Sequence, residues 1–196
     1  MNSEEFWALV ESARAGIDDR PDDGGEAIAE ALTERLVATS PTDILDFEER
    51  FDRLQDALYR WDVWAAAYLI SGGCSDDSFM DFRAGVIALG RDWYERVLAS
   101  PDSLADHPAV RQAAVDGADE AIFAELVNYA AGDAYQRLTG GDDDAFDEAL
   151  RAREGAVADA DSGDVDMGED FDFDNDDEMR RRLPRLADLF LDHVID

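Results

Sequence analysis

Apolar residues recur along this chain at the spacing of an amphipathic α-helix. In the clearest stretch they follow one another at intervals of three and four residues, with charged residues between them: Ile44, Phe47, Phe51, Leu54, Leu58 and Trp61. This spacing places them on one helical face, and Thr42 is positioned to cap the helix. Nowhere do β-branched or aromatic residues alternate with polar ones as a half-buried strand requires. The pattern predicts an all-α fold, a multi-helix bundle.

Further helices are expected over residues 3–15, 26–38, 119–138 and 142–154. The third should face the core with Ile122, Phe123, Leu126, Ala130 and Leu138. Residues 62–71 are apolar nearly all round, which predicts a central helix that packs on several sides and ends at Gly72 and Gly73.

Ser75 is a natural N-cap for the next helix, which we expect to run on through Val97. Gly85 and Gly90 lie inside that helix, where glycine is destabilising by about 0.5–1 kcal/mol relative to alanine. A kink at Gly90, or close packing against the helix that carries Ala65 to Ala67, would account for them.

The C-terminal part changes in composition. Residues 155–178 hold eleven acidic side chains and no basic one, with few large apolar residues, so we predict a mobile acidic segment. A short turn over residues 177–182 should lead to a helix with Pro184 in its first turn. Its apolar residues should dock it on the bundle: Leu183, Leu186, Leu189, Phe190 and Val194. This divides the chain into a helical domain (1–154), a flexible segment (155–178) and a docking helix (179–196).

Charge excludes several classes of partner. The 17 basic residues, all arginine, face 49 acidic ones, for a net charge of −32. Such a chain is repelled by nucleic-acid backbones and anionic membranes, so we expect neither direct nucleic-acid binding nor membrane association, and a basic protein as partner. One cysteine, and an N-terminus without the basic and apolar regions of a signal peptide, favour a cytoplasmic location.

The sharpest chemical feature is the block from Gly72 to Arg83, which places a thiol, hydroxyls, carboxylates and a guanidinium near a helix N-terminus. With two neighbouring residues it forms a candidate binding cluster: Asp62, Trp64, Cys74, Ser75, Asp76, Asp77 and Arg83. Cys74 could act as a nucleophile. However, the adjacent aspartates oppose thiolate formation, and no histidine is near in sequence. We therefore assign no catalytic residue and expect a small structural thiol.

Arg83 should lie beside an apolar face, where a charge must be paired. We expect an ion pair with one of four carboxylates: Asp62, Asp76, Asp77 and Asp81. The alternative is a binding cleft organised around that pair. Several aromatic residues could line a ligand pocket, although at helical spacing they favour core packing: Trp61, Trp64, Tyr68, Trp93 and Tyr94.

Metal and cofactor sites find little support. One cysteine and two histidines fall short of a structural zinc site, and the Glu-x-x-His pairs of di-iron bundles do not occur. The acidic segment partly matches a calcium loop through Asp159, Asp161, Asp164 and Asp166, but Gly163 is at position 5 instead of 6. We expect no metal site and no cofactor.

A family resemblance is carried by several motifs: Phe6-Trp7, Trp64 to Tyr68, the Gly72 to Phe79 block, Phe82-Arg83 and Pro101 to Leu104. On these residues the chain resembles the bacterial family known as domain of unknown function 4240. The later Phe171 to Asp174 and Leu183 to Leu186 are similar to the end of that family. The resemblance implies kinship and carries no activity with it.

Three functions stay open. A non-enzymatic cytoplasmic interaction or regulatory module fits the absence of an acid, base and nucleophile set and the strong negative field. A small-molecule binder or enzyme would use the Gly72 to Arg83 block. An acidic mimic of nucleic acid would occupy the basic groove of a nucleic-acid-handling protein.

Overall fold

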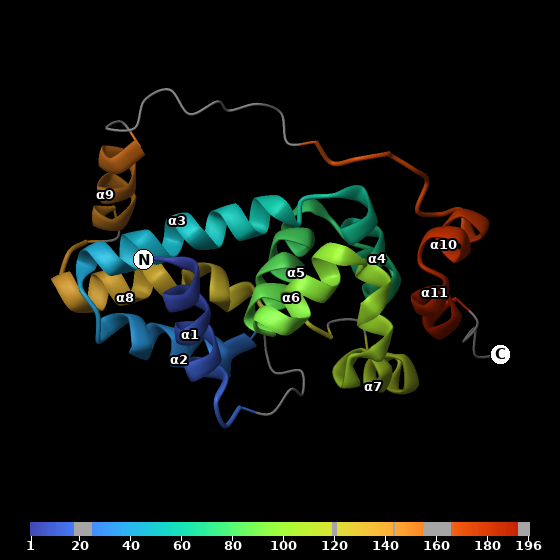
Figure 1. The fold of residues 1–196 in the computed structure, drawn as a ribbon, viewed down its shortest axis with the longest axis horizontal. Coiled ribbons are helices and arrows are strands. Elements are labelled where there is room, and N and C mark those ends of the chain that lie inside the picture. Colours follow the sequence, from blue (N-terminus) through green and yellow to red (C-terminus); the bar gives the residue numbers. More distant parts are fainter. Residues whose placement is uncertain (18–24, 119–120, 143, 155–165, 192–196) are drawn as a thin grey trace.

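A computed structural model describes residues 1–17, 25–118, 121–142, 144–154 and 166–191 of the chain. Over these ranges all regular structure is helical, so the predicted all-α multi-helix fold is confirmed. The molecule is elongated, with the N-terminal helices towards one end and the C-terminal helices at the other (Figure 1). None of the described helices combines the length and apolar surface needed to cross a bilayer.

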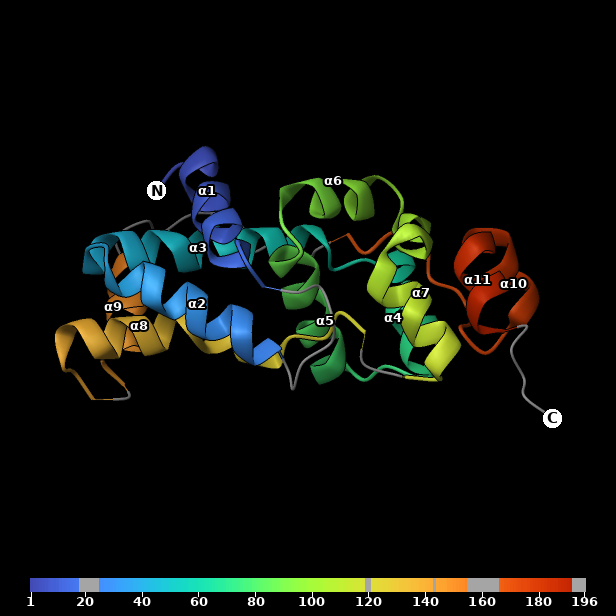
Figure 2. The same cartoon turned by 90° about the horizontal axis from the view of Figure 1, so that it is seen from below.

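One end of the molecule consists of α1 (Ser3–Arg14), α2 (Glu26–Val37), α3 (Pro41–Ala57), α8 (Ala130–Thr139) and α9 (Ala145–Glu154). Helix α2 lies along α8, and α3 packs on α8 from the other side, while α9 contacts α8 (Figures 1 and 2). The rings of Phe6 and Phe47 stack at 4.7 Å between α1 and α3, and both side chains are fully buried. The amphipathic stripe predicted for α3 therefore forms the core of this end.

Two predicted features of α3 are wrong in detail. The N-cap is Ser40, not Thr42: Asp43 N–H donates to Ser40 Oγ at 3.2 Å, and the Asp43 carboxylate accepts in return, with Pro41 at the first helical position. The helix also ends at Ala57 and does not continue to Trp61. Arg60 adopts an extended backbone (φ −139°, ψ 147°) that separates the two helices.

Helix α4 (Trp61–Ser71) is the predicted central helix, and six of its residues are buried: Val63, Ala65, Ala66, Ala67, Leu69 and Ile70. It ends at Gly72, whose left-handed backbone (φ +65°) suits glycine. Helix α5 (Asp76–Ala88) follows, capped by Ser75 as predicted, with Ser78 N–H donating to Ser75 Oγ at 3.2 Å. The apolar pattern and the capping residue together determined this part of the fold.

The helix predicted from Ser75 through Val97 is broken in two at Gly90. That residue has φ +90°, and α6 (Arg91–Ala99) starts directly after it. The Glu11 carboxylate of α1 lies where a Gly90 side chain would be and accepts from Arg91 N–H at 3.0 Å. Gly85 packs against the carbonyl of Ile122, not against the alanines of α4. At both positions the absence of a side chain therefore allows a segment that is distant in sequence to approach the backbone closely.

The helix predicted over residues 119–138 is wrong in its first half. Residues 119–120 lie outside the described ranges, Ile122 has φ +102°, and a 3₁₀ helix η3 (Glu125–Tyr129) precedes α8. Ala124 N–H donates to the Asp81 carbonyl at 3.1 Å, so this segment is bonded to α5 instead of to itself. Leu126 and Leu138, which we expected in the core, are 39% and 37% exposed.

The other end holds η2 (Pro101–Asp106), α7 (Pro108–Asp116), α10 (Asp176–Arg182) and α11 (Pro184–Phe190). Helix α11 packs on η2 and α4, with Leu186 fully buried. The buried Asp102 carboxylate accepts from the backbone N–H groups of Arg185 and Leu186 and so caps α11. Residues 177–182 belong to a helix, not to the turn we expected. Val194 and residues 155–165 lie outside the described ranges.

Candidate functional site

The predicted cluster is only partly brought together. Trp64 Nε1 donates to the Cys74 carbonyl at 3.0 Å, and the Trp64 ring stacks on Phe79 at 4.8 Å. Ser75 caps α5, and the carboxylates of Asp76 and Asp77 face solvent in its first turn. These residues therefore hold the α4–α5 corner in place, as capping residues do.

The Cys74 thiol is half-buried in this corner. Burial is the main cause that raises its pKa to about 11, and the nearby Asp81 and Asp76 carboxylates add to the effect. A thiol with this pKa is protonated at neutral pH and is a poor nucleophile. The geometry thus favours the structural role over the catalytic one.

Arg83 does not form the expected ion pair in the described part of the chain. Its Nη1 donates to the Gln55 carbonyl at 3.1 Å, and the guanidinium lies 4.9 Å from the ring centres of both Tyr59 and Phe79. Desolvation lowers the Arg83 pKa, as burial of a cation must. Arg83 thus joins the end of α3 to α5 through a carbonyl and two aromatic rings.

Asp62 lies apart from the other members of the cluster. Its carboxylate accepts from Arg60 Nε at 3.0 Å in the first turn of α4. Both side chains line a hollow of about 240 Å³ together with residues 166–169 and Arg182. The seven predicted residues therefore occupy two neighbouring places and do not converge on one centre.

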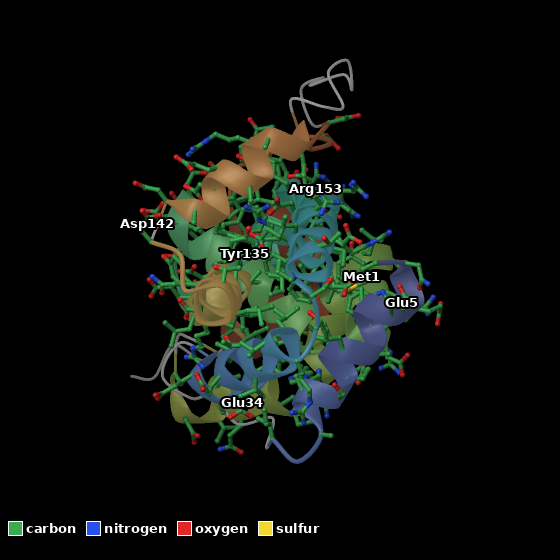
Figure 3. All side chains as sticks on the ribbon, turned by 90° about the vertical axis from the view of Figure 1, so that its left-hand side faces the viewer. Met1, Glu5, Glu34, Tyr135, Asp142 and Arg153 are labelled. Atoms are coloured by element: carbon green, nitrogen blue, oxygen red, sulfur yellow. The ribbon has the colours of Figure 1, made fainter. Side chains whose placement is uncertain are left out.

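A larger acidic and aromatic surface lies at the opposite end of the molecule. A groove of about 400 Å³ runs between α3, η3, α8 and α9, and we call it the acidic groove. Carboxylates and aromatic rings dominate its lining: Glu48, Tyr129, Asp133, Tyr135, Asp142, Phe146 and Asp147. The described residues that line it include no arginine. In Figure 3, which looks onto this end, Tyr135 lies on α8 and Asp142 just before the start of α9.

Glu48 is the most perturbed group of the acidic groove. It is half-buried on α3, and burial together with the charges of Asp52 and Asp147 raises its pKa to about 8. At neutral pH this carboxyl therefore holds a proton, and a cation brought close to it would favour its ionised form. Asp147 itself pairs with Arg151 at 3.3 Å on the exposed side of α9.

Asn128 connects the acidic groove to the interior. Its Oδ1 accepts from Gln55 Nε2 at 2.8 Å, and its Nδ2 donates to Asp81 Oδ1 at 3.0 Å. Burial and two neighbouring carboxylates raise the pKa of Asp81 to about 6, although the Asn128 bond opposes the shift. This chain of side chains joins η3 to both α3 and α5 and fixes one wall of the groove.

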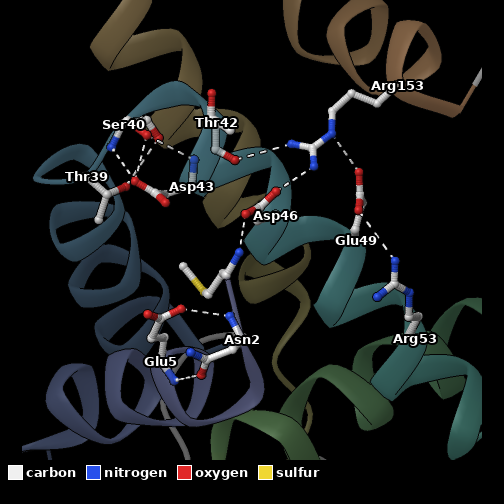
Figure 4. Close-up of polar contacts among 11 residues, drawn as sticks. Asn2, Glu5, Thr39, Ser40, Thr42, Asp43, Asp46, Glu49, Arg53 and Arg153 are labelled. Carbon is white, nitrogen blue, oxygen red and sulfur yellow. Dashed lines mark hydrogen bonds and ion pairs between the residues drawn. The ribbon is translucent and has the colours of Figure 1, made fainter. Parts of the chain in front are cut away.

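Helix α9 forms the outer wall and is held to α3 by one arginine (Figure 4). Arg153 donates to the Asp46 carboxylate and the Thr42 carbonyl, and its Nε pairs with Glu49 at 2.8 Å. The amino group of Met1 also pairs with Asp46. At the other side of α9, Phe146 packs on Tyr135 with ring centres 5.5 Å apart.

Sequence reasoning placed Glu48 on the polar face of its helix and missed the groove. The helical period of α3 is correct, but α9 covers that face through contacts between residues about a hundred positions apart, such as Arg153 with Asp46. The local signal available was the pair Tyr135 and Phe146 in an otherwise polar stretch.

Comparison with known proteins adds a family but no activity. No curated protein and no solved structure matches this chain. The sequence model of the family described as protein of unknown function (DUF4240) matches residues 1–137, which include the α4–α5 corner and most of the acidic groove. The match ends before Phe171 and Leu183, which we had also related to the family. Because it covers more than half of the chain, this protein belongs to the DUF4240 family.

Proposed function

We propose that the protein is a non-enzymatic cytoplasmic interaction module whose acidic groove binds a basic segment of a partner protein. The observation that carries the proposal is the lining of the groove, where four carboxylates and three aromatic rings meet without an arginine among the described lining residues. Arginine side chains pair with carboxylates and stack on aromatic faces, so this lining complements them in both respects.

The electrostatics of Glu48 support a cationic ligand. Its raised pKa means that the Glu48 carboxyl is uncharged at neutral pH, because burial and the neighbouring carboxylates disfavour its ionised form. A bound guanidinium would reverse this balance and release the proton. Affinity for an arginine peptide should therefore rise with pH through about 8, the pKa of Glu48. The net charge of −32 adds steering of a basic partner.

The Gly72 to Arg83 block gives less support to the alternative that the protein is an enzyme. The thiol pKa of about 11 disfavours a nucleophile, and the seven residues predicted around it lie in two places. An acidic mimic of nucleic acid would also bind basic proteins, but through carboxylates spread along the surface. The interaction module and the nucleic-acid mimic therefore differ in how strongly binding depends on the residues of the acidic groove.

The test is the affinity of a short fluorescein-labelled oligoarginine peptide, measured by anisotropy at low and at moderate salt. We compare the wild type with Glu48→Gln/Asp133→Asn and with a control, Glu26→Gln/Asp188→Asn, which removes at least as much negative charge at neutral pH from exposed carboxylates outside the groove. The groove variant should weaken binding about tenfold or more, the effect of 1.4 kcal/mol, and should lose most of the pH dependence. The control should bind like the wild type.

Equal weakening in both variants would show that binding follows net charge alone, as expected for a nucleic-acid mimic. Unchanged binding in both would contradict the acidic groove as the site. Circular dichroism of each variant verifies that it remains folded.

A further inference from the structure

Three aromatic rings line one face of α4. Trp61, Trp64 and Tyr68 lie at positions i, i+3 and i+7, and each is half-buried. The rings of Trp61 and Trp64 are nearly parallel, 5.6 Å apart with 8° between their planes. An aromatic face of this kind on a helix that is otherwise buried is a surface for apolar side chains.

Residues 166–174, which we call the strap, cover this face. The Phe173 ring reaches all three aromatic residues, with its centre 6.0 Å from that of Trp61, 6.4 Å from Trp64 and 5.5 Å from Tyr68. Phe171 packs on Phe173 at 5.1 Å. They are two positions apart, with Asp172 between them, and a turn follows in which Asn175 N–H donates to the Asp172 carbonyl at 3.3 Å.

Polar contacts also hold the strap, and two of its carboxylates take part in them. The Tyr68 hydroxyl donates to the Asp174 carboxylate at 2.6 Å, and the backbone N–H of Trp61 donates to the Met167 carbonyl at 3.0 Å. Glu169 pairs with Arg182 at 3.0 Å, and the same guanidinium lies 4.1 Å from the centre of the Phe171 ring. The strap therefore binds as a peptide ligand does, through two apolar anchors flanked by hydrogen bonds and an ion pair.

The C-terminal helices have packing and capping contacts that do not involve the strap. Met179 and Leu186 are fully buried, and Asp102 caps α11 through two backbone hydrogen bonds. Both phenylalanines of the strap, by contrast, are only half-buried. The aromatic face also lies within the part of the chain that matches the family, residues 1–137, whereas the strap lies beyond it.

We propose that the aromatic face of α4 is a peptide-binding surface for acidic segments with phenylalanines at positions i and i+2. The strap occupies this surface in cis and competes with such a segment from a partner protein. The surface is separate from the acidic groove, and its ligand has the opposite charge, so the two proposals stand or fall independently.

The probe is a synthetic peptide with the sequence of residues 166–175. It is titrated into the ¹⁵N-labelled protein up to millimolar concentration, because a tether supplies an effective concentration in that range. Phe171→Ala/Phe173→Ala frees the face without a change in charge, and Asp170→Asn, at an exposed strap position, is a control that leaves both rings in place. A peptide with both phenylalanines replaced by alanine tests whether the rings are the anchors.

The freed variant should bind the peptide at least about tenfold more tightly than the wild type and the control, with shifts of the Trp61 and Trp64 indole N–H signals. The alanine peptide should bind none of them. Resonances of α10 and α11 should stay in place in the freed variant, which shows that these helices remain docked. Absence of binding to the freed variant, or equal binding of both peptides, would overturn the proposal.

Discussion

Arg153 of α9 and Asp46 of α3 form an ion pair with 2.5 Å between Nη2 and Oδ1, and the same carboxylate pairs with the amino group of Met1 (Figure 4). These contacts lower the pKa of Asp46, chiefly through the bond from the amino terminus. Asp46 is thus a shared acceptor for the first residue and for the outer wall of the acidic groove. The shape of the groove depends on this junction, because the other described anchor of α9 is the packing of Phe146.

Arg153→Ala should release α9 without unfolding the protein. Asp46 keeps its bond to the Met1 amino group in this variant, so the protein should stay folded. Hydrogen exchange of the α9 amides should accelerate, and oligoarginine binding should weaken. Arg151→Ala, which removes an exposed pair on the same helix, is the control for hydrogen exchange and should leave the exchange of the α9 amides unchanged. Unaltered exchange in α9 of the Arg153 variant would contradict the anchoring role.

Glu48→Gln should alter the pH dependence of stability. The native pKa of about 8 lies above the unfolded value of about 4.5, so the folded protein retains a proton that the unfolded chain releases between these values. The wild type should therefore lose stability from this group as pH rises through that window, by up to about 1.4 kcal/mol per pH unit. The urea midpoint of the variant should therefore increase relative to that of the wild type as pH rises. Parallel curves would mean that the Glu48 pKa is ordinary.

Gly85 and Gly132 form a matched pair of helical glycines with opposite expected effects. A methyl group at Gly85 would overlap the Ile122 carbonyl, so Gly85→Ala should destabilise by about 1–3 kcal/mol or more. At Gly132 the nearest atom would be Phe146 Cδ1 at 3.5 Å, an ordinary contact. Gly132→Ala should stabilise by about 0.5–1 kcal/mol through better helix propensity. Denaturant unfolding distinguishes them, and similar midpoints would contradict the close approach at Gly85.

Cys74 should react slowly with a thiol reagent at neutral pH. Burial and nearby carboxylates hold its pKa near 11, so little thiolate is present in the folded state. The labelling rate should rise with pH towards that value and increase sharply in denaturant. Rapid labelling of the native protein at neutral pH would restore the nucleophile interpretation.

Sequence patterns predicted the helices wherever an element follows its own periodicity. The stripe of α3, the apolar α4 and the Ser75 cap are local features, and the structure bears them out. The errors occur where a distant segment decides the backbone. Glu11 interrupts the helix at Gly90, and Asp81 bonds the segment that we expected to continue as a helix before α8.

In the candidate site, too, local contacts could be predicted from the sequence and contacts between distant segments could not. Trp64 and Cys74, ten positions apart and both named in the predicted cluster, are in contact at the corner between α4 and α5. The expected ion pair of Arg83 was wrong because the guanidinium faces the end of α3, not Asp62 of α4 or the carboxylates of its own helix. The acidic groove requires α9 to lie across α3, and no pattern within either helix indicates that arrangement.

The location of a bound basic peptide tests the central claim most directly. An oligoarginine peptide with a nitroxide label at one end is added to the ¹⁵N-labelled protein, and paramagnetic broadening of amide signals is mapped. We predict strong broadening at groove positions, represented by Gly132 and Leu150, and little at the exposed acidic face of α2, represented by Glu26 and Glu34. Broadening that follows the acidic surface as a whole, or that centres on α2, would contradict the acidic groove as the binding site.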